Sequence, residues 1–519
     1  MYRWGSDEPR AENVPDGLRF SDTAPGGFES LDCTLARKPG TDYADLERLS
    51  TLRVLGAGGD VAWEGRLERA PRTSGQTMGV SPSAVGWQAH LDDDKSAAVI
   101  FIDRDMNHWA DAPLTRRAQL AVTGVGGGKI PVSRTGGIVW EVPAEALSAA
   151  EETDLVYDAG PGVKVARLDY RGVRTGASWA GSFQAPFVFS SDDDAFVTGV
   201  TFASLTLDNA GHPATALTAR RYLMLTARTT SAVTPAAGHQ QRFDVLNVIG
   251  DHGLTMPASS IDGFGGVLAS DAVAYAVDRW APLLTTSVGP SMFVVPHLVF
   301  REPTTAAEIV RQATRYGLQD WAVWEDKTFH WHERGARGRR WRARIGPAQL
   351  EETGPQVDRL WESSIVQYQD VDGSTRTVGP PGSGADTEDA VLKDDDPENP
   401  ANKLGIIRRD LLTMGVSTAA GATEIGRRFL EQTKLLDSSG RARIVGHVMD
   451  DRGVMHPYWR VRAGDYISFV DSASTGYRRI VRSEKSTSDR SCTIDLDAPP
   501  DGLAALLERL GVGLVSLGL

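Results

Sequence analysis

Two histidines and a glycine-rich turn are the first residues in this sequence whose types and spacing could support chemistry. His330 and His332 are two residues apart on an expected strand, so their side chains share a face and could bind a metal ion. Trp331 lies between them and no third ligand is near in the sequence, which favours a solvated pair. The run Gly124–Lys129 resembles a phosphate-binding loop but lacks its spacing and the Ser or Thr after the lysine. A plain turn is therefore the favoured interpretation.

Two runs of three aspartates are candidates for calcium binding. Asp92–Asp94 and Asp192–Asp194 could supply carboxylate oxygens, with loop carbonyls completing the coordination. Such runs also occur as ordinary acidic turns at strand ends, and this is the interpretation we favour. We therefore expect no metal or other cofactor, with calcium at the acidic loops as the alternative.

Four aromatic residues between positions 179 and 189 form a candidate platform for sugar binding. Trp179 is the residue we assign to stacking on a sugar ring, because its ring is large and amphipathic. Phe183, Phe187 and Phe189 alternate along one expected strand, the pattern of a strand with one face in the core. We therefore favour a core role for the phenylalanines.

The short motifs of common catalytic sites are absent from the sequence. It has no GxSxG nucleophile elbow, no Walker loop, no HExxH helix and no CxxC pair. Nothing marks a pair of carboxylates for glycoside hydrolysis, whose separation is defined only in three dimensions. We therefore predict that the protein is not an enzyme.

Composition and charge indicate a soluble globular chain of several domains. Its 519 residues exceed what one core supports, and 24% charged residues is ordinary for a folded protein. A net charge of −13 disfavours a DNA-binding surface, because affinity for DNA depends on Lys and Arg. We find no long apolar run and no signal peptide, so we expect no membrane span and assembly in the cytoplasm. Cys33 and Cys492 are expected to be reduced, packed thiols.

Strand-like alternation is strongest between Thr51 and Leu91. The run Val61–Glu68 alternates apolar and polar residues after a glycine turn, and a second alternating run follows from Val85 to Leu91. Three half-buried antiparallel strands, forming a small barrel or sheet, are therefore predicted.

This order of hairpins resembles the opening of tail-hub proteins, which are minor tail or baseplate hub proteins of long-tailed bacteriophages. The residues that carry the resemblance are Val-Ala-Trp-Glu-Gly-Arg-Leu-Glu (61–68), Val-Gly-Trp-Gln-Ala-His-Leu (85–91) and Phe-Ile-Asp-Arg-Asp (101–105) with Trp109. It returns at Arg-Ile-Val-Gly-His-Val (443–448), Asp-Arg-Gly (451–453) and Pro457–Asp465. The two ends together cover about half of the chain.

The resemblance implies a structural protein at the distal end of a virion tail, assembled in the host cytoplasm. Such hubs are homotrimers in which each subunit contributes two related barrel modules, so that six barrels meet the six-fold tail tube. The opposite three-fold face meets a central spike or fibre. The implied partners are the tail tube or distal tail protein, the tape measure protein and the fibre, with genome ejection through a central channel. A host-surface glycan is a further partner if the protein takes part in host attachment.

The predicted fold is mainly β with α+β segments. The predicted parts are a first small antiparallel barrel module at residues 1–148, an inserted jelly-roll-like β-sandwich at 149–238, a mixed α/β middle domain at 239–377, a flexible acidic loop at 378–403, a second barrel module with a preceding helix at 404–500, and a C-terminal helix with an apolar tail at 501–519. Short strands at even spacing indicate the sandwich. Its presence leaves open a carbohydrate-binding or carbohydrate-active protein, and a distal-tail ring protein is the second alternative.

The middle and last parts carry more local predictions. Helices are expected from Ser270 to Trp280 and after Thr305, followed by a hairpin over residues 321–332. Gly464 separates two alternating strands of the last module. It is predicted to take the third position of a type II turn, where a positive φ favours glycine.

Overall fold

The structure is a computed structural model. It describes residues between Asp16 and Leu496. The described residues are 16–36, 48–56, 58–70, 72–73, 79–95, 97–111, 132–133, 137–141, 152–175, 186–197, 199–207, 214–228, 240–257, 266–291, 294–295, 297–315, 319–333, 338–344, 350–353, 363–369, 374–380, 393, 409–416, 419, 422–423, 426–427, 430, 439–470 and 477–496.

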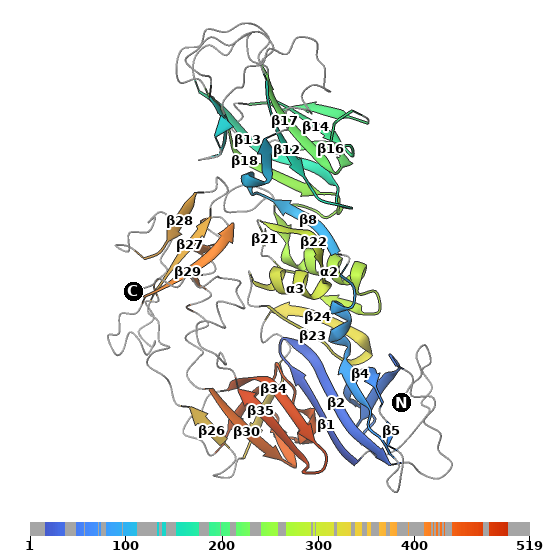
Figure 1. The fold of residues 1–519 in the computed structure, drawn as a ribbon. Coiled ribbons are helices and arrows are strands. Elements are labelled where there is room, and N and C mark those ends of the chain that lie inside the picture. The colour runs from blue at the N-terminus through green and yellow to red at the C-terminus, as the bar shows by residue number, and fades with distance from the viewer. Residues whose placement is uncertain are drawn as a thin grey trace.

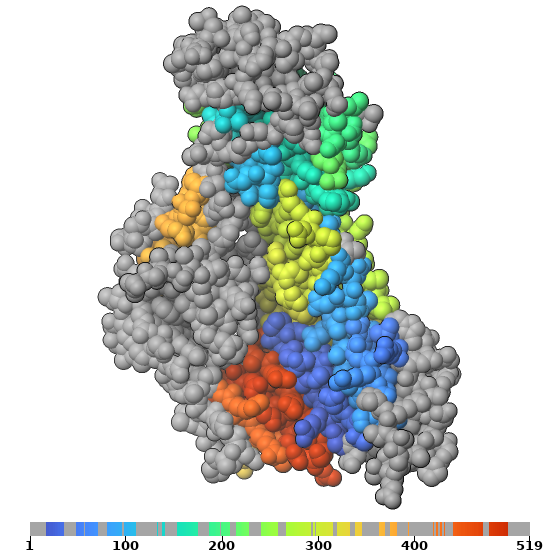
Figure 2. Space-filling view, in the orientation of Figure 1, coloured from blue at the N-terminus to red at the C-terminus, as the bar shows by residue number. Residues whose placement is uncertain are grey.

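Strands from the two ends of the chain form one continuous sheet, in the lower part of Figure 1. The order of its neighbouring strands is β3 (Thr51–Leu55), β4 (Val61–Arg69), β7 (Ser83–Gly86), β2 (Gly26–Ala36), β1 (Asp16–Thr23), β34 (Arg478–Ser486), β35 (Ser491–Leu496), β30 (Ser439–Val445) and β26 (Leu350–Thr353). We call β1–β7 the first module and β25, β26 and β30–β35 the last module. The two modules meet where β1 pairs antiparallel with β34, and their surfaces adjoin in Figure 2.

Shorter strands attach to this sheet at its sides. They are β5 (Arg72–Thr73), β6 (Gly79–Val80), β25 (Arg340–Ala343), β31 (His447–Asp450), β32 (Met455–Pro457), β33 (Tyr466–Phe469), β20 (Thr285–Val288), β23 (Gln319–Val323) and β24 (Thr328–Glu333). The mainly β class is as predicted, but within the described residues no sheet closes into a barrel. β1 pairs with β2 on one side and with β34 of the last module on the other, so the strands of the two modules continue into one sheet.

The hairpin region of the first module differs from its sequence pattern at one point. The alternation predicts a strand through Leu91, but β7 ends at Gly86 and residues Trp87–Asp92 form a short 3-10 helix, η1. Trp87 and Leu91 are four residues apart, so the helical turn directs both into one core. The apolar–polar alternation over these residues therefore does not indicate a strand. Burial of the Trp87 and Leu91 side chains favours the helical turn.

Two helices form the middle layer between the sheets (Figure 1). α2 (Ala269–Trp280) and α3 (Ala306–Arg315) match the predicted helices, and β23 and β24 form the predicted hairpin around η3 (Glu325–Lys327). Val273 and Val277 of α2 and Val310 of α3 face a shared core that also contains Trp87 and Trp331. This core joins the first module to the middle layer.

Two further sheets form a β-sandwich in the upper part of Figure 1. One sheet contains β10 (Val132–Ser133), β11 (Ile138–Glu141), β18 (Gln240–Gly250), β13 (Val165–Thr175), β16 (Ala214–Arg220), β8 (Ala97–Asp103) and β22 (Leu298–Thr304). The other is β15 (Thr201–Ser204), β14 (Phe187–Ser191), β17 (Tyr222–Arg228), β12 (Glu152–Asp158) and β9 (Trp109–Asp111). Each sheet buries one face in a common core.

The sandwich extends beyond the predicted insertion at residues 149–238. Its core includes Ile100, Trp109 and Trp140 from before that range and Phe243 from after it, all fully buried or nearly so. β18 pairs with β13 along almost its whole length. Because these residues share one core, the sandwich is built into the chain on both sides and is not a separable insertion.

Two small sheets complete the described fold. β27 (Ser363–Gln369) pairs with β28 (Thr375–Val378) and, in parallel, with β29 (Arg409–Val416), and β19 (Val267–Leu268) pairs with β21 (Val294–Val295). Of the predicted acidic loop, Lys393 forms a bridge to Ser363, and most other residues of that loop lie outside the described residues. The predicted terminal helix and apolar tail at 501–519 lie outside them as well. No helix in the described part is long and apolar enough to cross a membrane.

Candidate functional site

The contact between the first and last modules contains a fully buried ion pair. In the β1–β34 register, Phe20 lies opposite Lys485 and Asp22 lies opposite Ser483. Lys485 Nζ contacts the Asp22 carboxylate, and both side chains are 0% exposed. Asp22 Oδ1 also accepts hydrogen bonds from Ser483 Oγ at 2.5 Å and from the backbone N–H of Ala463 at 2.6 Å. The two ends of the chain are thus joined by backbone pairing and by a satisfied buried charge pair.

Each module contains one cysteine, Cys33 in β2 and Cys492 in β35. Both are free and buried, as the sequence predicts. Cys492 lies opposite Lys485 in the β34–β35 pairing, and burial raises the pKa of its thiol to about 12. Burial likewise raises the pKa of Cys33 to about 11, with a smaller contribution from the charge of Asp32. Because the thiolate is the reactive form of cysteine, these raised pKa values keep both buried thiols protonated and unreactive at neutral pH.

One arginine of the last module contacts both the first module and the β23–β24 hairpin. The Arg462 guanidinium lies 5.2 Å from the ring centres of Phe28 in the first module and Trp324 after β23. Its Nη2 donates to Glu325 Oε1 at 2.7 Å and to the backbone oxygen of Val61 at 2.8 Å. Burial raises the pKa of Glu325, but the hydrogen bond and charge of Arg462 outweigh this and hold the pKa below its usual range.

A pocket of about 260 Å³ opens where these parts meet. It brings together His330, His332 and Gly464, three residues that the sequence singled out separately. His330 and His332 lie on one face of β24 as predicted, opposite Ala322 and Asp320 of β23. The other lining residues are Ala24, Asp320, Trp321, Ala322, Trp324, Glu325, Gly338, Arg339, Arg462, Ala463 and Asp465. Within the described residues no three potential ligands cluster to hold a metal ion.

A buried carboxylate holds the turn that forms one wall of this pocket. Asp465 accepts hydrogen bonds from Trp341 Nε1 at 2.8 Å and from the backbone N–H groups of Arg339 at 2.9 Å and Arg462 at 3.0 Å. Burial raises the pKa of Asp465 above its usual range even though these donors favour the charged form. The turn itself is closed by a bond from the Asp465 N–H to the Arg462 oxygen, 3.2 Å, which makes Gly464 its third residue.

Gly464 has a φ of +90°, the region in which a side chain is strained. We expect Gly464→Val to lower the free energy of unfolding by roughly 1–2 kcal/mol, because a β-branched residue is disfavoured there. Gly446→Val offers a matched control, since Gly446 also has a positive φ, +76°, with open space around it, but lies away from the pocket. Both variants should melt at lower temperature, and an unchanged melting temperature for Gly464→Val contradicts the turn assignment.

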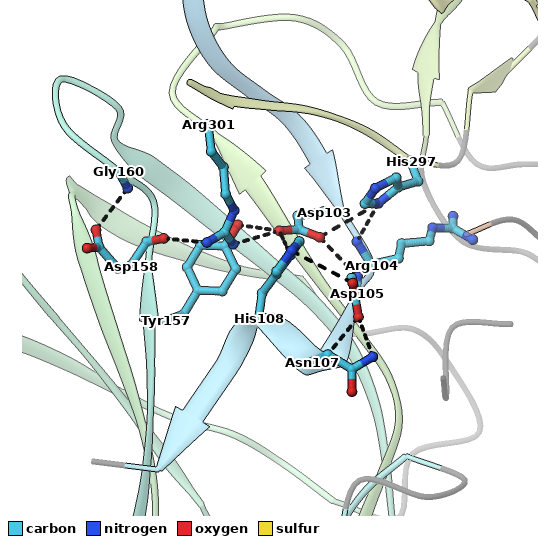
Figure 3. Close-up of polar contacts among 10 residues, drawn as sticks. All are labelled: Asp103, Arg104, Asp105, Asn107, His108, Tyr157, Asp158, Gly160, His297 and Arg301. Carbon is cyan, nitrogen blue, oxygen red and sulfur yellow. Dashed lines mark hydrogen bonds and ion pairs between the residues drawn. The ribbon is translucent and has the colours of Figure 1, made fainter. Parts of the chain in front are cut away.

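A second buried carboxylate, which the sequence patterns did not reveal, lies where the sandwich meets the middle layer (Figure 3). Asp103 at the end of β8 is 0% exposed at its side chain. It accepts hydrogen bonds from Tyr157 of β12 at 2.6 Å, His108 Nδ1 at 2.7 Å, Arg301 of β22 at 3.0 Å and the backbone N–H of Asp105 at 3.0 Å. Because these donors come from β12 of the five-stranded sheet and β22 of the seven-stranded sheet, the carboxylate ties the two sheets of the sandwich together.

The charge state of this cluster depends on pH. Burial raises the pKa of Asp103, but the hydrogen bond from His108 and the charges of His297 and His108 hold it well below its usual range. Burial lowers the pKa of His297, whose Nδ1 accepts the backbone N–H of Arg104 at 3.2 Å. Burial also raises the pKa of Tyr157 well above its usual range. At neutral pH the cluster is therefore an ionised carboxylate surrounded by hydrogen-bond donors.

The depressed pKa of Asp103 predicts a loss of stability in acid. A carboxyl whose folded pKa lies below its unfolded pKa, about 4, stabilises the fold above that pH and ceases to do so as pH falls through the folded value. We expect Asp103→Asn to lower the melting temperature at pH 7 and to flatten the decline in melting temperature that the unsubstituted protein shows as pH falls from about 5 toward 2. Asp192→Asn, which removes an exposed carboxylate paired with Arg220, is the control. Parallel pH curves for Asp103→Asn and the unsubstituted protein would falsify this assignment.

The four aromatic candidates from the sequence fall at two places. Trp179 and Phe183 lie outside the described residues. Phe187 and Phe189 are half-buried on the outer face of β14, contrary to the expected core role, because Val188 between them is the residue that enters the sandwich core. The alternating pattern therefore identified the strand correctly but assigned the phenylalanines to the wrong face of the sheet.

The acidic runs are engaged by arginines. Arg66 contacts Asp93 through both terminal nitrogens, one of them at 2.8 Å, and Thr305 Oγ1 donates to Asp92 at 2.8 Å. In the second run, Arg220 Nη1 lies 2.5 Å from Asp192. Asp92 and Asp93 lie at the end of η1 and Asp192 follows β14, and each of these carboxylates has a cationic or hydroxyl partner.

Comparison with known proteins gives no family match and no curated relative. Among solved structures, the chain is similar to the 43 kDa tail protein of prophage MuSo2 from Shewanella oneidensis, with 7% identity, a TM-score of 0.42 and 97% of each chain covered. It is similar to the prophage tail protein gp18 from Listeria monocytogenes, with 8% identity and a TM-score of 0.44 over 98% of this chain and 97% of that one. It is also similar to a chain of the native gene transfer agent virion, with 12% identity and a TM-score of 0.37 over 74% and 89%. These neighbours are of the kind that the sequence resembles, and TM-scores below 0.5 establish neither a shared fold family nor a function.

Proposed function

We propose that this chain is a structural, non-catalytic component of a phage tail tip, where three copies form a hub at the distal end of the tail. The observation that carries the proposal is the joint between the two ends of the chain. β1–β34 pairing, the buried Asp22–Lys485 pair and Arg462 hold two β modules in one orientation within each copy. Three such copies present six modules, the number that a six-fold tube requires.

The sequence resemblance supplies the remaining parts of the proposal. One face of the trimer joins the tail tube or distal tail protein, and the other joins a central spike or fibre, with the tape measure protein as a further partner. The central channel serves genome ejection. The formal charge of −13 per chain supports a channel that passes DNA without binding it stably.

The mass of the assembled particle tests this proposal. Three copies of a 55.9 kDa chain give about 168 kDa, and six give about 335 kDa. We expect the purified protein, or its complex with the tail tube protein, to contain three copies, measured by light scattering and by three-fold averages of single particles. A six-copy ring would instead support the distal-tail ring protein, and a monomer at all concentrations and in the presence of tube protein would reject both.

Carbohydrate binding by the sandwich is a second candidate, favoured by one observation. Phe187, Phe189 and Phe202 form an aromatic cluster on the outer face of the five-stranded sheet, with ring centres 6.1–6.5 Å apart. Phe202 is 70% exposed, and exposed aromatic rings are suited to stacking on sugars. Binding of the full chain to a glycan array, lost in Phe202→Ala and retained in the exposed-residue control Val470→Ala, supports this role. An array without signal rejects it.

A further inference from the structure

An exposed row of three arginines lies on one face of the last module. β25 and the residue that follows it place Arg340, Arg342 and Arg344 at alternate positions, and all three are exposed, whereas Trp341 and Ala343 between them are buried. We name these three arginines the arginine stripe. Alternate side chains of a strand lie roughly 6.5–7 Å apart, so the stripe is roughly 13 Å long.

The arginine stripe has no ion-pair partner within the described part of the chain. Other arginines there are paired: Arg53, Arg220 and Arg301 each lie at most 3.0 Å from a carboxylate. Near the stripe, Asp451 acts on Arg342 only through its charge. The stripe therefore differs from arginines such as Arg53 and Arg220, each of which is neutralised by a neighbouring carboxylate.

The residues directly opposite the stripe on the two neighbouring strands are uncharged: Arg342 lies opposite Met449 of β31, whose Asp450 lies opposite the buried Trp341. Arg340 lies opposite Tyr466 and Arg342 opposite Ser468 in the pairing with β33. Arg342 Nε donates to the hydroxyl of Tyr477 at 3.3 Å, and the Arg340 guanidinium lies 5.3 Å from the centre of the same ring. Like charges in a row on one face of a sheet repel, and a negatively charged partner would remove that repulsion.

We propose that the arginine stripe binds the acidic run of a second copy of this chain, Asp394-Asp395-Asp396-Pro397-Glu398. In an extended segment, Asp394, Asp396 and Glu398 lie on one side with the same spacing as the three arginines, so each carboxylate meets one guanidinium. A proline within the run favours the extended backbone that this match requires. The contact is one between the last module of one copy and the segment before β29 of another.

Two observations favour this occupant over others. Arg340, Arg342 and Arg344 are all exposed in the single chain, so the stripe is open to a second copy. A stripe of three arginines is short for duplex DNA, whose binding proteins contact roughly 6–10 phosphates, and the rest of a chain at −13 repels such a polyanion. A short acidic segment meets only the stripe and avoids that repulsion.

Binding of a peptide tests the contact directly. The probe is a labelled peptide with the sequence of residues 392–400, and its control carries Asn, Asn and Gln at the positions of Asp394, Asp396 and Glu398. The receiving full-length chain carries the same three neutral substitutions, so that its own run does not compete. Fluorescence anisotropy at low salt should show binding of the acidic peptide and not of the neutral one.

Removal of the stripe should abolish this binding selectively. We expect Arg340→Thr with Arg342→Thr and Arg344→Thr to weaken peptide binding about tenfold, the sum of three exposed ion pairs. The matched control replaces Arg167, Arg220 and Arg441 by Thr, which changes the net charge equally at arginines paired within their own copy. Equal weakening in both triple variants, or no binding to the receiving chain, overturns the proposal. A duplex DNA probe serves as a further comparison. If the unsubstituted protein binds it more tightly than the acidic peptide, and the stripe variant does not bind it, the stripe binds nucleic acid instead.

This inference rests on the proposed self-association, and the two fail in distinguishable ways. If stripe variants lose the peptide but the unsubstituted protein is a monomer, the hub is rejected and the stripe keeps a peptide-binding role. If the protein is a trimer and the peptide does not bind, the hub stands and the contact is rejected. Both measurements use the same purified chain.

Discussion

Lys485→Met should open the contact between the first and last modules. The substitution leaves the Asp22 carboxylate buried and without its cationic partner, which costs about 3–5 kcal/mol in comparable buried pairs. The loss is local, because the pair joins only β1 and β34. We therefore expect the joint to open long before the sandwich unfolds.

Cysteine reactivity measures this opening. Cys492 lies opposite Lys485 and is fully buried, so a thiol reagent reaches it only when the joint opens. A loss of about 3–5 kcal/mol should accelerate labelling of Cys492 by about 10²–10⁴-fold under native conditions. Asp22→Asn combined with Lys485→Met removes both charges and keeps an acceptor for Ser483, and it should restore slow labelling. Lys95→Met, at an exposed lysine, is the control. Labelling of Lys485→Met at the rate of the unsubstituted protein would show that the charge pair does not hold the joint.

Arg462→Ala should loosen the same junction from its other side. The side chain loses a bond to Glu325, a bond to the Val61 oxygen and two aromatic contacts, which together amount to about 2–3 kcal/mol. Glu325 is then left without the partner that lowers its pKa, so the pKa should rise toward its usual range. The fluorescence of Trp324, which faces the guanidinium, should change in the same variant.

Conservative replacement separates charge from geometry at this position. Arg462→Lys keeps the positive charge but has no planar fork to bridge Glu325 and Val61, so its free energy of unfolding should fall between those of the unsubstituted protein and Arg462→Ala. Arg441→Ala, which removes an exposed ion pair with Asp495, should have little effect. Urea unfolding followed by tryptophan fluorescence checks the order. Equal stability of Arg462→Ala and Arg441→Ala contradicts the central role of Arg462.

Local patterns predicted the local structure well. The helices over 269–280 and 306–315 and the hairpin at 319–333 follow from period and from turn residues, and the positive φ of Gly464 follows from its place between two strands. Each of these is determined by residues within about a dozen positions of one another. Alternation failed at Trp87 and at Phe187, where the core lies on a side that a single strand does not reveal.

The sequence patterns did not predict contacts between residues far apart in the chain. Asp22 and Lys485 are separated by 463 positions, and neither has a neighbour in the chain that marks it as buried. Asp103 likewise resembles any acidic residue at the end of a strand, and only its partners on β12 and β22 distinguish it. The sandwich boundaries failed for the same reason, because Trp140 and Phe243 enter its core from outside the range with the most regular strands.

The pairing of β1 with β34 sets a time order for biosynthesis. β1 leaves the ribosome more than 450 residues before β34 is made, since the two strands pair Phe20 with Lys485. At about 5–20 residues per second, translation takes roughly 25–90 s to cover that distance. During that interval β1 presents an unpaired edge, which neighbouring nascent chains on the same messenger can pair with. Only chains that extend through β34 satisfy this edge internally, so shorter products are the species that we expect chaperones or proteases to remove.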